Sequence, residues 1–274
     1  TNYEKNEVGM YLALAQLLSS SPEATATAER YSNQINHSIN NDFLLLTKEE
    51  RDFYWKHYRY YLPMFNWMMS EDPTKLGCIY NNVIQAKGML LRTYKEIQDA
   101  ILSASDSTMR KKYLHLQELR NELNANADTN IALCLRDSIE TLDRELTTKL
   151  KLKKKQTTWE DIRNALGNNE VAIEFTNIPR PMKLDSIQKL TGEPRYCALI
   201  LKKSYDKPHL IELFTEEQFD AIPDSSYYTS SRLYQLFWAP ISQEIGSASV
   251  VYYSPDRYMS SVAFENILSN EGKS

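Results

Sequence analysis

The spacing of hydrophobic residues divides the chain into two parts of different character. In the first part they recur at every third or fourth position, which predicts amphipathic helices. Glycine and proline are scarce there, so long helices with few breaks are expected. A short first helix should end near Ser19–Pro22. Its buried face is expected to carry Val8, Tyr11, Leu12, Ala15 and Leu18.

Further helices follow along the first part. Thr47 and Glu50 have the spacing of a capping box, in which two side chains satisfy free backbone N–H groups at a helix start. The helix that follows carries Phe53, Tyr54, Tyr58, Tyr61 and Leu62, and a kink or break is expected at Pro63. Another helix is expected from about Lys75 to Ala100, with one face formed by Ile79, Val83, Ala86, Leu90 and Ile97.

A near-heptad seam then predicts an antiparallel helical hairpin with its turn at 124–128. The first arm is marked by Tyr113, Leu116, Leu119, Arg120 and Leu123. The second arm is marked by Ile131, Leu135, Ile139, Leu142, Leu146 and Leu150. Helix pairs of this kind stack into arrays in which each pair buries its apolar face against its neighbours, although no fixed-period repeat is evident here.

The pattern changes after Lys155. A short capped helix is expected from Thr158 to Gly167, and three strands are expected at 171–175, 196–201 and 209–214, the last two forming a hairpin. A helix at 229–245, kinked or ended near Pro240, a buried strand at 249–253, a turn at 254–256 and a final element at 261–267 complete this part. The fold class is therefore mixed, with helical hairpins over residues 1–155 and an α/β layer over residues 156–274.

Composition narrows the classes of function. A net charge of −4 over 274 residues gives no general attraction to nucleic acid. The basic run Lys149–Lys155 is read first as a solvated helix end. No apolar stretch is long enough to cross a membrane. Three widely spaced cysteines indicate reduced thiols in a cytoplasmic protein, and the absence of an initiator Met predicts that the natural chain extends before Thr1.

No residue presents the sequence context of a catalytic, cofactor-binding or metal-binding group. His37, His57, His115 and His209 are the only imidazoles, and none has a second ligand at metal-binding spacing. Cys197 lies within an expected strand, where a small buried thiol is common. The glycine-rich phosphate motifs and the GxSxG motif of serine hydrolases do not occur. We therefore predict no cofactor and no metal.

Aromatic residues are dense between Phe53 and Trp67. They fall on more than one face of the expected helix, so a single neighbouring helix cannot bury them all. We interpret them first as a thick core between stacked helices. The alternative is that some stack on peptide side chains or on bases.

The second part resembles the N-terminal part of the CHAT domain, a caspase-like peptidase module related to separase and often found behind TPR helices. Its matching stretches are 159–162, 171–175, 196–201, 209–214, Leu236–Pro240, Val251–Asp256 and Ser261–Glu265. These stretches occur in the order of that family and span about residues 157 to 268. The segment Gly88–Arg92 is similar to the helices that link TPR repeats to CHAT domains.

The resemblance implies a cysteine peptidase with a His–Cys dyad, regulated by protein partners. In that family both residues of the dyad belong to the part that follows this chain's last residues, so no catalytic residue is carried over and this chain alone is expected to be inactive. We expect a protein or peptide partner on the helical arm, and the missing C-terminal half or a second copy on the sheet edge. The alternatives are a non-enzymatic scaffold with a degenerate caspase-like fold, and an RNA-sensing arm that uses Lys149–Lys155 and the aromatic cluster.

Overall fold

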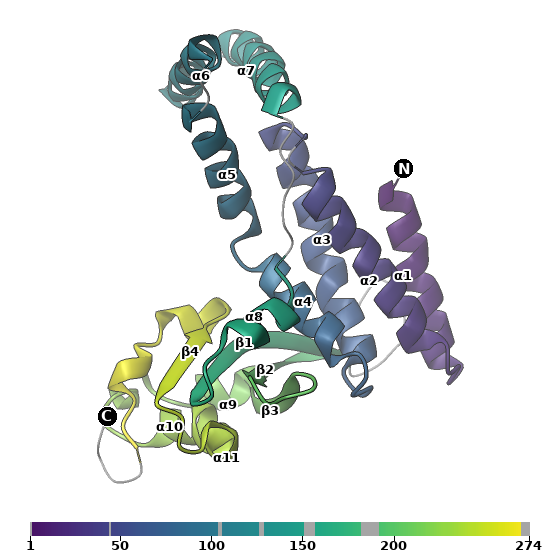
Figure 1. Ribbon diagram of the computed structural model, residues 1–274, viewed down its shortest axis with the longest axis vertical. Coiled ribbons are helices and arrows are strands. Elements are labelled where there is room, and N and C mark those ends of the chain that lie inside the picture. The colour runs from purple at the N-terminus through teal and green to yellow at the C-terminus, as the bar shows by residue number, and fades with distance from the viewer. Residues whose placement is uncertain are drawn as a thin grey trace. The chain divides into compact units, whose positions relative to one another are not determined.

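The protein combines helices with one four-stranded sheet, as the sequence predicts at this coarse level (Figure 1). A computed structural model describes residues 2–43, 45–103, 106–125, 129–150, 157–181 and 192–269. The first seven helices are α1 (Asn2–Leu18), α2 (Ala24–Asn41), α3 (Lys48–Met69), α4 (Leu76–Ala86), α5 (Met89–Ser103), α6 (Ser107–Ala125) and α7 (Thr129–Leu150). They are followed by α8 (Trp159–Ala165), β1 (Glu170–Pro181), β2 (Gly192–Lys202), β3 (His209–Thr215), α9 (Glu216–Asp220), α10 (Arg232–Phe237), α11 (Ser242–Ile245) and β4 (Val250–Ser254).

The chain forms two compact units, and each is built from separate stretches of sequence. The sheet unit comprises residues 1–32, 61–87 and 157–274. The hairpin unit comprises residues 33–60 and 88–156. The predicted division at residue 155 follows the type of secondary structure. Packing instead groups α1 and α4 with the sheet.

The face of α1 that is buried differs from the predicted one. Val8, Leu12 and Leu18 are 62%, 41% and 54% exposed, whereas Met10, Ala13 and Leu14 are buried. The reason is close approach, because the Tyr31 ring lies against the backbone of Gly9 where any Cβ would clash. The close approach at Gly9 therefore selects the face that carries Met10, Ala13 and Leu14, and Val8, Leu12 and Leu18 remain outside it.

Two helix boundaries also differ from the prediction. Helix α3 continues unbroken through Pro63, because the buried residues Leu62 and Phe65 beside it each contribute about 1.5–3 kcal/mol of burial, against about 3 kcal/mol for an interior proline. The helix expected from Lys75 to Ala100 is instead α4 and α5, because Gly88 adopts a left-handed conformation with φ +64°. Helix α2 was not predicted.

The sheet has the strand order β3-β2-β1-β4, in which β1–β2 and β2–β3 are antiparallel and β4 runs parallel to β1. The predicted β2–β3 hairpin is thereby confirmed. Val171, Ile173 and Phe175 of β1 share one face with Ala198 and Ile200 of β2. That face is covered by apolar side chains from after β3, namely Phe219, Ile222, Leu233, Phe237, Ile241, Met259, Val262, Phe264 and Ile267. Helix α4 packs against β1 from the opposite side (Figure 1).

The predicted elements after β3 are present in altered form. The helix expected at 229–245 is split into α10, a 3-10 turn that contains Pro240, and α11. The final element consists of two short 3-10 turns, Arg257–Ser261 and Phe264–Asn266. Strand β4 was expected to be buried, but Val250, Tyr252 and Tyr253 are 39%, 52% and 41% exposed, because β4 lies at the edge of the sheet.

A buried polar ladder joins three helices of the sheet unit. The Ser32 hydroxyl donates to the Asn82 side-chain oxygen at 2.7 Å, and the Asn82 amide donates to the Asn66 side-chain oxygen at 2.6 Å. All three residues are buried. Polar groups in an apolar interior are costly unless paired, so the ladder fixes the register of α2, α3 and α4.

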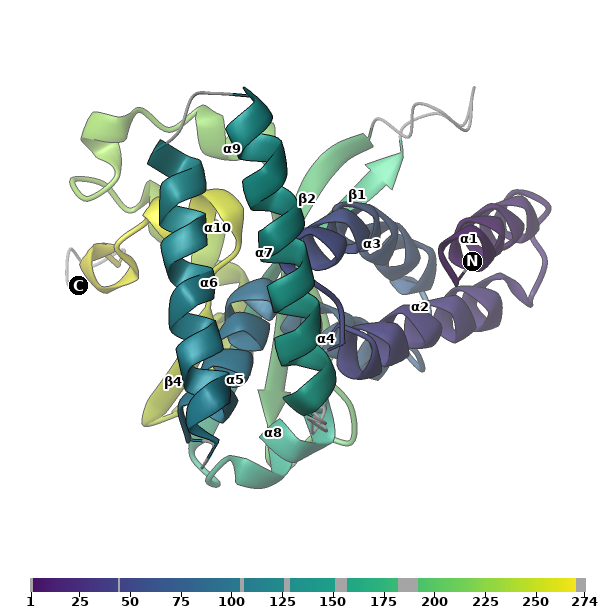
Figure 2. The same cartoon turned by 90° about the horizontal axis from the view of Figure 1, so that it is seen from above.

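The hairpin unit contains the predicted pair of helices α6 and α7, which lie side by side (Figure 2). Its core is formed by Ile97, Ile101, Met109, Leu116, Ile139 and Leu146, with Tyr113, Leu119, Leu123 and Leu142 packed against them. The predicted seam is therefore correct through its middle. Ile131, at the start of the second arm, is 45% exposed.

A carboxylate of α7 caps the start of α3. The side chain of Asp143, 5% exposed, accepts a hydrogen bond from the Lys48 backbone N–H at 2.6 Å and lies 3.4 Å from Nη2 of Arg120. The predicted capping box is also present, since the Glu50 carboxylate accepts from the Thr47 N–H at 2.8 Å and the Thr47 hydroxyl accepts from the Glu50 N–H. Negative charge at a helix start complements the helix dipole, so Asp143 ties the hairpin to α3.

Replacing Asp143 with Ala should lower the free energy of unfolding by about 1–3 kcal/mol, because the Lys48 N–H and Arg120 both lose a buried partner. Urea unfolding would measure the loss, and hydrogen exchange at the Lys48 amide should become faster. Asp143→Asn retains an acceptor and should cost less than Asp143→Ala. The exposed carboxylate of the same helix, tested as Asp137→Ala, should change stability by less than about 0.5 kcal/mol. Equal effects at both positions would contradict the capping role.

Candidate functional site

The four histidines lie apart and each has a local partner. His37 contacts the Asn41 amide, His57 lies 2.9 Å from the Phe53 carbonyl oxygen, and His115 pairs with Glu118. His209 stacks on Tyr205 and contacts Glu244 at 3.2 Å. No group of three or more His, Cys, Asp or Glu side chains with metal-binding geometry occurs within the described part of the chain.

The cysteines are spread over environments that do not favour a thiolate nucleophile. Cys197 is buried in β2, and burial followed by the neighbouring Glu212 raises the pKa of its thiol to about 12. Burial likewise raises the pKa of Cys78 to about 11. Cys134 is exposed on α7. Because a reactive cysteine requires a lowered pKa, neither Cys78 nor Cys197 is suited to nucleophilic chemistry.

The most developed polar cluster lies where α4 meets the sheet. Nζ of Lys87, at the end of α4, is 2.7 Å from Oε2 of Glu174 in the middle of β1. The same nitrogen donates to the Ser254 carbonyl oxygen at 2.8 Å and to the Ser254 hydroxyl at 3.1 Å, at the end of β4. The Lys87 and Glu174 side chains are only 20% and 16% exposed. Burial lowers the pKa of Lys87, although Glu174 opposes that change.

This cluster holds neighbouring elements of the fold together. It does not have the arrangement of an activated nucleophile. A serine nucleophile needs a base that accepts its proton, but here the Lys87 ammonium donates to the Ser254 hydroxyl. Burial lowers the pKa of Lys87, and the adjacent Glu174 carboxylate opposes that change by favouring the charged form. The cluster thus joins α4, β1 and β4 through one ammonium group.

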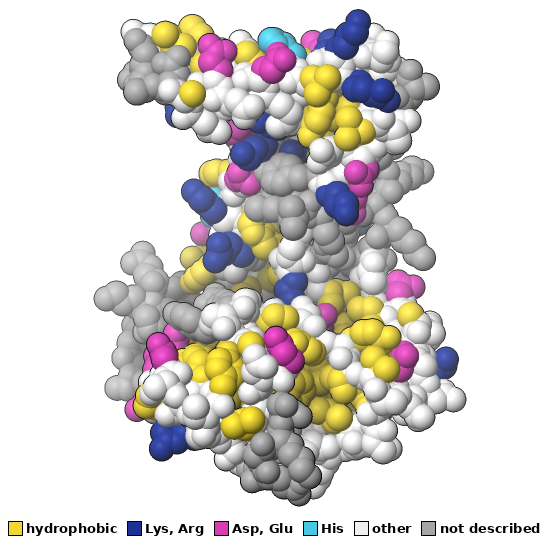
Figure 3. All heavy atoms as spheres, turned by 90° about the vertical axis from the view of Figure 1, so that its left-hand side faces the viewer, with side chains coloured by type: hydrophobic (Ala, Val, Ile, Leu, Met, Phe, Trp, Pro, Cys, Tyr) yellow, Lys and Arg dark blue, Asp and Glu magenta, His cyan; other side chains and the backbone are white. Residues whose placement is uncertain are grey.

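The edge of β4 is an apolar feature of the sheet unit that the described residues leave uncovered. Its inner side pairs with β1 from Glu170↔Val250 to Glu174↔Ser254, and its outer side has no neighbouring strand in the described part of the chain. Hydrophobic side chains gather on the sheet part of the face that Figure 3 turns toward the viewer. Exposed strand edges are templates for pairing with another strand.

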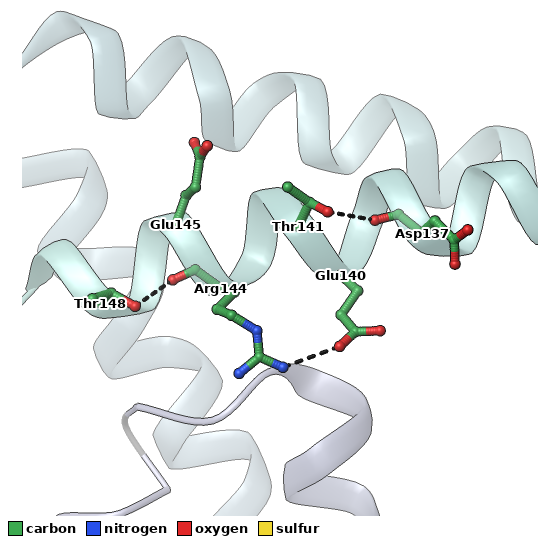
Figure 4. A pocket seen from close by; sticks show the side chains of 6 residues that line it. All are labelled: Asp137, Glu140, Thr141, Arg144, Glu145 and Thr148. Atoms are coloured by element: carbon green, nitrogen blue, oxygen red, sulfur yellow. Dashed lines mark hydrogen bonds and ion pairs between the residues drawn. The ribbon is translucent and has the colours of Figure 1, made fainter.

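A cavity of about 590 Å³ lies along one side of α7 (Figure 4). Its described lining consists of exposed polar side chains from that helix: Asp137, Glu140, Thr141, Arg144, Glu145 and Thr148. The Arg144 guanidinium bonds to Glu140 at 3.0 Å and to Glu50 at 3.1 Å, which fixes it against the start of α3. The described side chains that line it are polar, and Arg144 links this face of α7 to the start of α3.

The sequence also pointed to the aromatic segment between Phe53 and Trp67 and to the basic run Lys149–Lys155. In the aromatic segment, Tyr58, Tyr61 and Phe65 are buried, while Phe53 and Tyr60 are 56% and 48% exposed. The segment thus contributes both core and surface. Of the basic run Lys149–Lys155, residues 151–155 lie outside the described residues, and the side chain of Lys149 is not described.

Comparisons of the chain with protein-family models, with curated proteins and with solved structures found no match. Among the described helices, none is both long enough and apolar enough to cross a membrane. Assignment of a function therefore rests on the chemistry of the surfaces and clusters themselves.

Lys87, Glu174 and Asp143 were not identified by the sequence reasoning. Each partner is distant along the chain, and no spacing rule joins residues 87, 174 and 254. One signal was present, because Glu174 interrupts the apolar run Val171–Phe175, and a carboxylate inside such a strand requires a cation. The sequence does not say which of the many lysines and arginines supplies it.

Thiol labelling should separate the three cysteines. At about pH 8, iodoacetamide should modify Cys134 first, and Cys197 should react only when the protein is unfolded in urea, because its thiol is buried and its pKa is raised. Mass spectrometry of digested protein gives the order. Rapid modification of Cys197 in the native protein would show that its environment is reactive.

Replacing Lys87 with Met should destabilise the protein by about 2–3 kcal/mol, because Glu174 would keep its charge in a largely apolar setting without a cation. The double variant Lys87→Met/Glu174→Leu should recover most of that loss. Urea unfolding of the two variants and the native chain provides the measurement. Lys112→Met removes an exposed pair with Glu145 and should cost at most about 1 kcal/mol. A double variant no more stable than Lys87→Met would argue against the pair.

Proposed function

We propose that this chain is the helical arm and the first half of a caspase-like domain of the TPR-CHAT type, and that it serves as a partner-binding scaffold. In such a protein the arm binds a protein partner and the sheet supplies strands beneath a peptidase site. The order of the sequence stretches from Trp159 to Glu265 supports this family assignment.

The observation that carries the scaffold role is the exposed edge of β4. Val250, Tyr252 and Tyr253 place apolar surface beside backbone groups on the outer side of the strand. Parallel strands are normally covered on both faces and paired on both sides, so β4 is suited to receive a further strand. That strand would come from the remainder of the caspase-like sheet or from a second copy.

The buried ionisable side chains support a scaffold role for this chain in preference to a catalytic one. Lys87 and Glu174 are paired with each other, and the buried thiol of Cys197 has a raised pKa. A non-enzymatic scaffold with a degenerate caspase-like fold agrees with the same observations. A peptidase of the TPR-CHAT type would have a His–Cys dyad alongside these strands in the intact protein, and a degenerate scaffold would not.

The 274-residue chain should self-associate as its concentration rises, because an uncovered strand edge pairs with itself when no other strand is supplied. Light scattering after size exclusion measures the mass. Tyr252→Lys should shift the population toward monomer, since a charged side chain on an edge strand opposes pairing. Leu114→Lys changes an equally exposed apolar residue on α6 and should leave the mass unchanged. A native chain that stays monomeric at every concentration would contradict pairing through this edge.

A further inference from the structure

Part of the aromatic segment remains exposed on the first half of α3, within the hairpin unit. Phe53 and Tyr60 are 56% and 48% exposed. They are seven residues apart, which is about two helical turns, so their side chains lie on one face of α3. Large aromatic side chains are enriched where proteins bind one another, so this face is a candidate interaction surface.

The Phe53 ring is held in one orientation although its surface is exposed. Its centroid lies 4.8 Å from that of the His57 ring, one turn later, and 5.6 Å from that of the Tyr54 ring, which it meets edge-on. The His57 ring is fixed in turn, because its Nδ1 lies 2.9 Å from the Phe53 carbonyl oxygen. A ring that is already ordered loses little conformational entropy when it is covered, which favours binding through Phe53.

Exposed charges of opposite sign lie on either side of Phe53 in the same helix. Glu49 lies four residues before it and Arg59 six residues after it, and both are exposed. Neither has an oppositely charged residue three or four positions away in α3, so helical spacing does not pair them. The helix dipole accounts for Glu49 at the start of α3. It does not account for Arg59, because α3 continues to Met69.

This charge pattern is complementary to itself in the antiparallel direction. When two copies of α3 lie antiparallel about a two-fold axis near residue 54, Glu49 of each copy faces Arg59 of the other. Asp52 and Lys56 lie two positions on either side of the same point, so they also face each other. Phe53 of each copy lies next to the axis. A parallel pair would instead place like charges opposite one another, so the charges select the antiparallel arrangement.

We infer that the exposed face of α3 binds a second copy of this chain as an antiparallel two-fold pair. The face is formed by Glu49, Asp52, Phe53, Lys56, Arg59 and Tyr60. The rings supply apolar area and the charges fix the direction of the partner helix. Nucleic acid is disfavoured as the occupant, because the two carboxylates repel phosphate. One helix face is a small interface, so the pair forms in a concentration-dependent way. This face is separate from the edge of β4 and does not depend on the proposed scaffold role.

Sedimentation equilibrium of the full chain carrying Tyr252→Lys tests the inference, because that substitution opposes pairing through β4 and leaves association through α3. The mass should rise from monomer toward dimer with concentration. Arg59→Glu and Glu49→Arg, each added to this background, should weaken the dimer by at least about tenfold, because each places like charges opposite one another. An equimolar mixture of the two variants should dimerise as the parent does. One copy then carries two basic residues at positions 49 and 59, and the other carries two acidic ones.

Arg136→Glu is the matched control, since Arg136 is exposed on α7, outside this face, and its reversal should leave the dissociation constant unchanged. Circular dichroism checks that each variant is folded. Phe53→Lys should also weaken the dimer by at least about tenfold, which keeps the test valid if Glu49→Arg does not fold.

Three outcomes would overturn the inference. In the first, the Tyr252→Lys chain stays monomeric at every concentration, and a native chain that still associates would then do so through β4 alone. In the second, Arg59→Glu dimerises as tightly as its parent, or mixing the two folded charge variants restores no dimer. In the third, a chain that stays monomeric binds fluorescein-labelled oligouridylate and loses that binding with Phe53→Lys, which would assign the face to nucleic acid.

Discussion

A carboxylate inside an apolar strand is the constraint on which the sheet unit depends. Glu174 lies in the middle of β1, where burial of an unpaired charge would cost several kcal/mol. Lys87 satisfies it, so α4 must end beside β1 and the chain must turn away immediately, as it does at Gly88. The remaining donors of the ammonium reach Ser254, which places the end of β4 beside the same point.

The hairpin unit follows the same physical rule at a helix end. The first backbone N–H groups of α3 need acceptors, and Asp143 provides one from a position 95 residues later in the chain. The carboxylate also lies beside Arg120, while the neighbouring Arg144 bonds to Glu50. A few charged groups thus determine how the hairpin lies against α3, and the heptad seam only brings the two arms together.

These arrangements separate the charged groups that stabilise the protein from the apolar residues that remain on its surface. The paired charges are committed to structure, whereas Val250, Tyr252 and Tyr253 of β4 remain exposed at the edge of the sheet. Such an edge offers backbone hydrogen bonds and apolar area to another strand.

The sequence by itself determined the features that depend on neighbouring residues. The capping boxes at Thr47 and Thr158, the β2–β3 hairpin and the middle of the α6–α7 seam are all local in sequence. The tertiary structure alone decided the buried face of α1, the continuation of α3 through Pro63, and the edge position of β4. It also decided the pairing of Lys87 with Glu174 and the contacts of Asp143 with the Lys48 N–H and Arg120. The reason is that close packing and the pairing of buried charges depend on residues far apart in sequence, for which periodicity carries no information.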